Sequence, residues 1–213
     1  MDDQGHLGDA LRDRIRAGIQ VSVLSALRHW WGSVYPMLTN SAVVVDWPLE
    51  RIDLMIALSN CMLVAATQLT EAENAAWLAQ GHPLDLEASA LLDEYLLTGN
   101  KRIERIAAVT QERTLRELAL GGLAMVGRIE RWYGSERADH IADSETAYLW
   151  ADHTVYTMRR ADSHRWRWQH IGSDTPCEIF CQPNIGRIFS RNDTMPPFAS
   201  HVGCHCVGVV IVD

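Results

Sequence analysis

The N-terminal part of the chain carries apolar residues at the three- and four-residue steps that mark one face of a helix. The first such face consists of Leu11, Ile15, Ile19, Val23, Ala26, Leu27 and Trp30. Pro36 predicts that this helix ends near Tyr35, because proline disfavours helical backbone in the residue that precedes it. The segment 41–47 is expected to be extended or loop-like, and Pro48 suits the first turn of the next helix.

The same periodicity predicts further helices as far as about residue 157, with interruptions at glycine and proline. The expected helical segments are 49–67 with a continuation or restart at 71–80, then 84–97, 101–118, 123–132, and a last helix that reopens at Ser135. The expected interruptions are Gly81-His82-Pro83, Gly99-Asn100 and Gly121-Gly122.

The pattern changes after Arg160. Residues 164–171 alternate, with Trp166, Trp168 and His170 on one side and polar residues on the other, which predicts a strand. Residues 185–189 and the β-branched run 207–212 predict two more strands. We therefore predict an α+β fold in two parts: a mostly helical domain of residues 1–160, and a small β-rich, Cys/His-clustered module of residues 161–213.

Composition narrows the classes of function. The 213 residues carry a net charge of −8. This charge argues against a protein that wraps nucleic acid, and we expect any direct nucleic-acid binding to be weak. The longest apolar stretch, 54–69, is interrupted by polar residues and does not reach the uninterrupted length of a membrane span. The N-terminus has no signal-peptide pattern. We therefore expect a protein made in a cytoplasm, with no membrane partner.

Cysteine and histidine gather near the end of the chain. Four of the five cysteines fall in the last 37 residues, in the spacing C-x3-C followed by H-x2-C-x-C. Two close pairs that flank a loop suit a tetrahedral zinc ion. The predicted metal ligands are Cys177, Cys181, His201, Cys204 and Cys206. A module of about fifty residues is near the size at which burial alone offsets chain entropy, which favours such a staple.

Two alternatives for the cysteines stay open: they are reduced and packed as small apolar residues against the helical part, or they form disulfides. A catalytic zinc would need a nearby carboxylate, for which Asp174 and Glu178 are candidates by their place in the sequence alone. The chain contains no glycine-rich phosphate loop, no G-x-S-x-G elbow and no H-E-x-x-H motif. We therefore predict no catalytic residue.

Two further patterns have a structural and a functional interpretation. Glu145 and Asp152 lie seven residues apart on one predicted helix face, where ion pairing is favoured over an acid/base role. Trp166 and Trp168 alternate with arginines and could stack on bases, but this alternation more often marks the two faces of a half-buried strand.

Residues 137–147 (RADHIADSETA) resemble the RAxxIARTETxxA helix of the phage Mu F-like minor head proteins, also called phage head morphogenesis proteins. The elements that follow keep that family's order: Trp166-Arg167-Trp168, the first cysteine pair, Gly186, Pro196-Pro197, and the final group of His201, Cys204 and Cys206. The resemblance covers about residues 100–213. Asp143-Ser144 replace the family's arginine-threonine pair, and the first cysteine pair is one residue wider.

This resemblance implies a virion structural protein, a minor head component that associates with the portal or the major capsid protein during head assembly. It implies a place in the head or at the head-tail junction, after synthesis in the host cytoplasm, and a homo-oligomer if the chain sits on the portal ring. The residues themselves leave two alternatives: a zinc-dependent hydrolase or nuclease, including a toxin-like module, and a DNA-binding zinc module.

Overall fold

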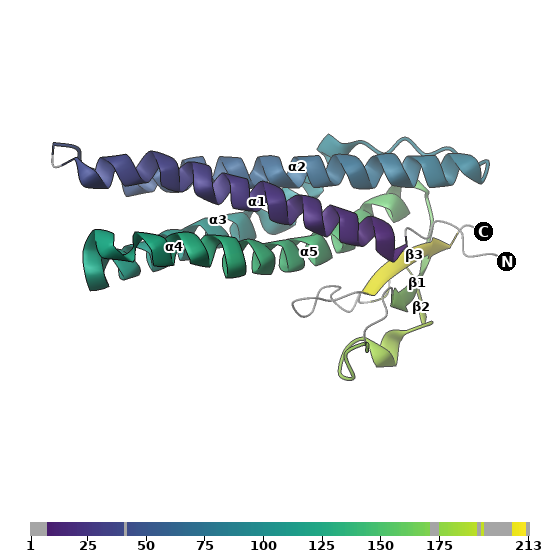
Figure 1. Ribbon diagram of the computed structural model, residues 1–213. Coiled ribbons are helices and arrows are strands. Elements are labelled where there is room, and N and C mark those ends of the chain that lie inside the picture. Colours follow the sequence, from purple (N-terminus) through teal and green to yellow (C-terminus); the bar gives the residue numbers. More distant parts are fainter. Residues whose placement is uncertain (1–7, 41, 171–174, 191–192, 194–205, 212–213) are drawn as a thin grey trace.

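The computed structural model describes residues 8–40, 42–170, 175–190, 193 and 206–211. Helices make up 75% of it, and a small three-stranded sheet lies near the C-terminus (Figure 1). The predicted α+β class is therefore confirmed.

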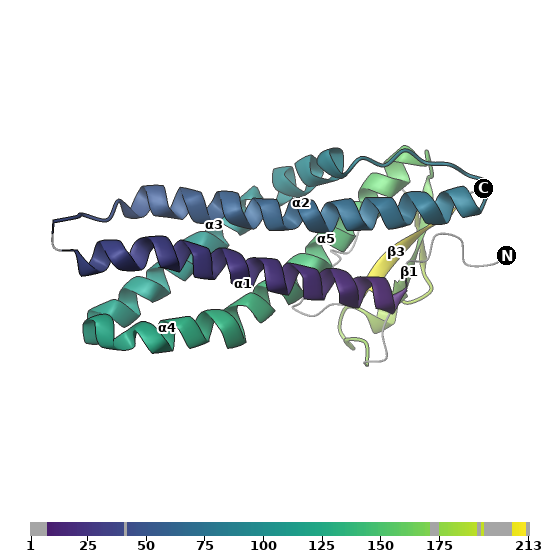
Figure 2. The ribbon, with the colours of Figure 1, turned by 45° about the horizontal axis from the view of Figure 1, so that its top comes forward.

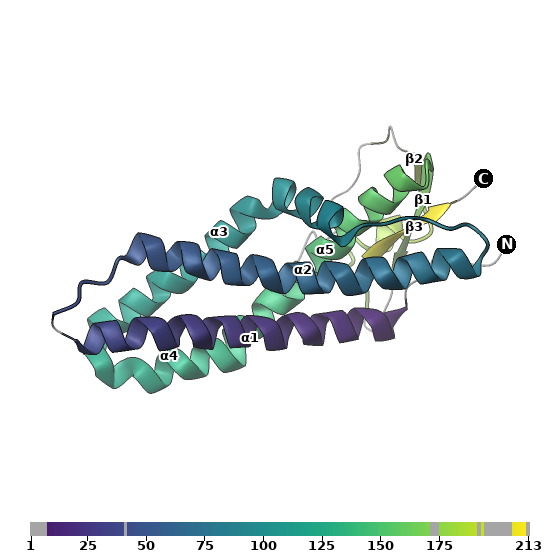
Figure 3. The same ribbon diagram turned by 90° about the horizontal axis from the view of Figure 1, so that it is seen from above.

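Long helices run up and down along one axis, and the sheet packs at the end where α1 begins and α2 and α5 end (Figure 1). Figures 2 and 3 show α1 and α2 side by side, with α3 returning behind them into the α4–α5 arm. The helical elements are α1 (Asp9–Thr39), α2 (Trp47–Ala79), α3 (Ala88–Gly121), η1 (Gly122–Met125), α4 (Val126–Trp132), η2 (Tyr133–Arg137) and α5 (Ala138–Arg160).

The sequence predicts the start of α2 well. Asp46 accepts a hydrogen bond from the backbone N–H of Leu49, and Pro48 occupies the first turn, where its missing N–H costs nothing. The segment before it is non-helical, as expected.

The expected end of the first helix at Tyr35 is wrong. α1 continues through Pro36 to Thr39. The proline lies in the last turn, where it removes one backbone hydrogen bond and few others depend on it, and the Thr39 hydroxyl donates to the Pro36 carbonyl.

The expected turn at Gly99-Asn100 is also wrong, because α3 passes through both residues as one helix. A glycine inside a helix costs only about 1 kcal/mol relative to alanine. Buried Leu91 and Tyr95 before it and Ile103 and Ala107 after it continue one apolar face, and their packing outweighs that cost.

The helix expected to reopen at Ser135 does not start afresh. Instead, α4 runs into α5 through η2, a five-residue stretch of π-helix. Such wide turns occur inside helices as local insertions.

The predicted strands are confirmed as β1 (Arg165–His170), β2 (Ile188–Ser190) and β3 (Cys206–Ile211). They form an antiparallel sheet in the order β2-β1-β3, in which Trp166 pairs with Phe189 on one side and Val210 on the other.

Both faces of the sheet share buried clusters with the helices. Val207 and Val209 join the main core formed by α1, α2, α3 and α5. Trp166, Trp168, Phe189, Cys206 and Val210 form a second cluster with Trp77 of α2 and Ala147 and Met158 of α5. The helical part thus supplies burial that the strands could not provide alone, and the expected division at residue 160 runs through shared packing.

Among the described residues, one helix, α2, is long enough and apolar enough to cross a membrane, judged by length and composition alone. The polar residues within 54–69 interrupt the apolar stretch, as noted above, but are too few to bring its mean hydropathy below that of a membrane span. About 39% of the apolar window is buried inside the protein.

Candidate functional site

The first cysteine pair lies in a turn that precedes the short helix η3 (Gln182–Asn184). The backbone N–H groups of Phe180, Ile179 and Cys181 donate hydrogen bonds to the Cys177 sulfur and lower the pKa of its thiol. The Cys181 thiol also donates to that sulfur. Amide donors of this kind stabilise a thiolate, which is the form that binds metal.

Cys181 is buried in the cluster beneath the sheet, against which Cys177 packs. Cys206 belongs to the same cluster, and its sulfur lies 3.8 Å from Nδ1 of His170, its partner across the β1–β3 ladder. Sequence reasoning placed His170 on the tryptophan face of the strand but did not count it among the ligands. The position of His170 in the sequence does not indicate that it lies near the cysteines, because only the register of β1 and β3 brings it to Cys206.

Two close pairs, Cys177 with Cys181 and Cys206 with His170, therefore border one apolar cluster. Within the described residues, no three histidine, cysteine or acidic side chains converge on a point that could hold a metal ion. The predicted ligands His201 and Cys204 lie outside the described residues. The donor chemistry of these two pairs suits zinc.

The structure adds no evidence for a catalytic role of the candidate carboxylates Glu178 and Asp174. Glu178 is exposed on the turn between the first two cysteines, and Asp174 lies outside the described residues.

Trp166 and Trp168 are almost completely buried, at 0% and 1% exposure, and Trp166 stacks on Phe189. Neither indole has a free face, so these tryptophans do not stack on nucleic-acid bases. The half-buried-strand interpretation is confirmed.

The two acidic residues spaced seven apart meet the same arginine. Arg102 of α3 lies 3.4 Å from the Glu145 carboxylate and 3.6 Å from that of Asp152. Its guanidinium also stacks over the rings of Tyr148 and Tyr95. The hydroxyl of Tyr95 donates to Glu145. Burial raises the pKa of Glu145, against the opposing effects of Tyr95 and Arg102.

Asp143 near the beginning of α5 forms an ion pair with Arg16 of α1. Arg16 binds Asp139 as well, at 2.6 Å. The two acids therefore fasten α5 to α1.

A groove of about 470 Å³ lies between α3 and the beginning of α5. Its lining residues are spaced one helical turn apart on each helix: Arg102, Arg105, Ile106 and Val109, then Arg137, His140, Ile141, Ser144, Glu145 and Tyr148. Three guanidinium groups and one carboxylate thus face one groove in a protein of net charge −8. This groove was not predicted from the sequence, although the i, i+3 and i+7 spacing of its lining residues is visible in both segments of the chain.

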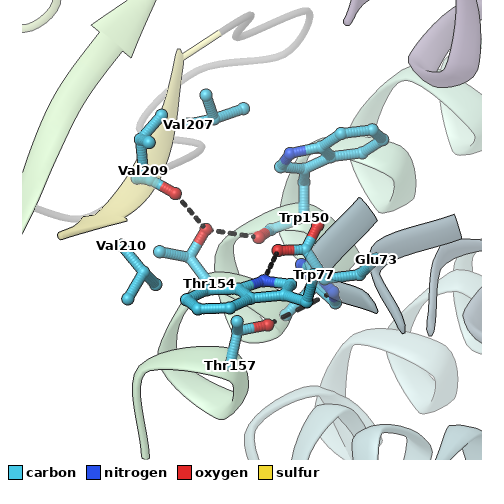
Figure 4. Close-up of a pocket in the computed structure, with 10 residues that line it drawn as sticks. Glu73, Trp77, Trp150, Thr154, Thr157, Val207, Val209 and Val210 are labelled. Atoms are coloured by element: carbon cyan, nitrogen blue, oxygen red, sulfur yellow. Dashed lines mark hydrogen bonds between the residues drawn. The ribbon is translucent and has the colours of Figure 1, made fainter. Parts of the chain in front are cut away.

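A second, smaller pocket lies where α2, α5 and β3 meet (Figure 4). Trp77 donates its indole N–H to the Glu73 carboxylate at 2.7 Å, and Thr154 donates to the carbonyls of Trp150 and Gly208. Burial raises the pKa of Glu73 to about 7 and lowers the pKa of His153 to about 3. The cavity holds about 20 Å³, the size of one water molecule, and is too small for an organic ligand.

The outer face of α2 carries a row of exposed apolar side chains: Leu49, Ile52, Ile56 and Leu63. Their spacing of three, four and seven residues places them along one line of the helix. The opposite face packs into the main core through Leu54, Leu58 and Met62. We call this exposed line the α2 row.

Comparison with known proteins gives no assignment. No protein-family model, curated protein or solved structure matches the chain.

Proposed function

We propose that this chain is a phage minor head protein, a structural component of the virion that docks on the portal or the major capsid protein during head assembly. The observation that carries the proposal is the α2 row, in which four aliphatic side chains are each at least 38% exposed along one helix face. An exposed row of aliphatic side chains on one helix face is typical of an interaction surface. The resemblance of residues 100–213 to the head morphogenesis family supplies the partner.

The proposal assigns a structural role to zinc. Cys177, Cys181, His201, Cys204 and Cys206 are its proposed ligands, and the amide hydrogen bonds to the Cys177 sulfur support a thiolate there. A zinc ion bound by these residues would hold the turn around Cys177 against β3. The zinc-dependent hydrolase and DNA-binding alternatives receive no support from the described residues, because Glu178 is exposed and the tryptophans are buried.

The test is incorporation into particles. The chain, its portal protein and its major capsid protein are produced together, and assembled heads are purified and analysed for the chain. We expect wild-type chain in the heads and at least a tenfold loss for the double variant Ile52→Gln/Ile56→Gln, because two buried amides would lack partners in the interface.

The control is Leu120→Gln, the same kind of change at an exposed residue near the end of α3. It should leave incorporation unchanged. Circular dichroism of each variant checks that the helices persist. Absence of the wild-type chain from heads, or equal incorporation of the double variant, would overturn the proposal.

A further inference from the structure

The groove between α3 and α5 contains positive charge that the protein itself does not neutralise. Glu145 is already engaged by Arg102 and Tyr95. Among the described residues, neither Arg105 nor Arg137 has an ion-pair partner. Two guanidinium groups thus remain available to an anion.

Arg137 is held in place for such a role. Its Nε donates to the Thr110 hydroxyl at 3.1 Å, and its Nη2 donates to the Ile106 carbonyl at 2.9 Å. Both acceptors are neutral. Burial lowers the pKa of Arg137, and the nearby charge of Arg113 lowers it further. A half-buried cation beside another cation is costly unless an anion completes the site.

The rest of the groove is apolar and elongated. Ile106, Val109 and Ile141 form its walls, and the ring of Tyr148 that borders it already stacks on Arg102. This leaves little aromatic surface for a nucleobase.

We infer that the groove binds an acidic segment of a partner protein, with a glutamate or aspartate side chain between Arg105 and Arg137 and an aliphatic neighbour against Ile106 and Ile141. Guanidinium groups recognise carboxylates through paired, charge-assisted hydrogen bonds. A segment that lies along two helices would place side chains at successive turns of both.

The experiment measures binding of the full chain to a fluorescein-labelled, end-blocked peptide of glutamate, leucine and alanine by fluorescence anisotropy. The same peptide with every glutamate replaced by glutamine is the matched ligand. We expect saturable binding of the acidic peptide, weakening as salt is raised, and at least tenfold weaker binding of the glutamine peptide.

The first variant is Arg105→Gln, because this side chain is exposed and its loss leaves the fold intact. It should weaken binding about tenfold, the typical contribution of one charge-assisted hydrogen bond. Arg116→Gln is the control, since Arg116 lies on the same helix but pairs with Glu112 outside the groove. Arg137→Lys should also weaken binding, because lysine keeps the charge but loses the paired geometry.

Three results would overturn the inference: no saturable binding, equal affinity for the two peptides, or tighter binding of a single-stranded oligonucleotide that Arg105→Gln abolishes. The Ile52→Gln/Ile56→Gln variant should bind the acidic peptide as wild type does. Failure of head assembly through the α2 row is therefore distinguishable from failure of the groove.

Discussion

The helical bundle and the C-terminal sheet are built in different ways. The bundle draws its main core from four long helices, which contribute many aliphatic and aromatic side chains along their length. The sheet depends on a few large side chains, above all Trp166 and Trp168, and on partners that α2 and α5 supply. Stability in the bundle is therefore distributed, whereas stability in the sheet is concentrated in a few residues and in its contacts with the helices.

Metal removal is expected to have the largest effect on the difference in stability between the sheet and the bundle. If zinc holds the cysteine turn against β3, purified chain contains one equivalent of zinc, and chelation opens the sheet while the helices persist. Structural zinc contributes on the order of 10 kcal/mol in small metal-dependent folds. Metal analysis and amide hydrogen exchange of β1 and β3, before and after chelation, provide the measurement.

Cys177→Ser should remove the zinc, whereas Cys61→Ala should not, since Cys61 is buried in the bundle. Unchanged amide protection in β1 and β3 of metal-free chain would show that packing against the helices suffices.

Truncating one core side chain in each region has the next largest effect. Trp168→Ala should cost about 3–5 kcal/mol, because it removes a fully buried aromatic side chain from a small cluster. Leu58→Ala should cost about 2–5 kcal/mol in the bundle. Urea unfolding followed by circular dichroism and tryptophan fluorescence gives both values.

The two variants should differ in which region loses its amide protection. Trp168→Ala should release exchange protection in the strands alone, and Leu58→Ala should lower protection throughout the helices. Equal loss in both regions for both variants would mean that the sheet and the bundle form one cooperative unit.

The smallest expected effect is the pH dependence of stability at the boundary between bundle and sheet, where Glu73 and His153 are buried. The raised pKa of Glu73 gives stability that is complete below about pH 4.5 and is lost as pH rises towards 7, by about 3 kcal/mol. The lowered pKa of His153 gives stability that is complete above about pH 6.5 and is lost as pH falls towards 3. Between pH 4.5 and 6.5 these two contributions oppose each other.

Glu73→Gln keeps an acceptor for the Trp77 indole and removes the titration. It should be more stable than wild type by about 3 kcal/mol at pH 8 and should show only the rise with pH that His153 causes. His153→Gln should show only the fall. Thermal unfolding from pH 4 to pH 8 measures both, and identical profiles for Glu73→Gln and wild type would contradict the assignment.

Much of the fold follows from local pattern. Helix periodicity and strand alternation gave the α+β class, and the capping of α2 by Asp46 and Pro48 is visible in the sequence. Helix α1 passes Pro36 because a proline in the last turn removes only one backbone hydrogen bond. Helix α3 passes Gly99 because packing on both sides of the glycine outweighs a cost of about 1 kcal/mol.

The sites were less predictable. The cysteine spacing indicated one cluster, but His170 reaches Cys206 only through the register of β1 and β3. The Arg102–Glu145 pair joins positions 43 residues apart, and the groove beside it needs the crossing of α3 and α5. Sequence distance carries no information about such contacts. Glu73 lies four residues before Trp77 on a buried face, a weak signal that a solvated helix face would also produce.

The π-helical turn η2 sets the rotational phase of α5. One extra residue in a helix turns everything after it by about 100°. With ordinary winding through 133–137, Asp139 and Asp143 would swing away from Arg16, and Glu145 would leave Arg102. A single widened turn thus keeps two faces of one helix aligned, one fastened to α1 and the other open as the wall of the arginine groove.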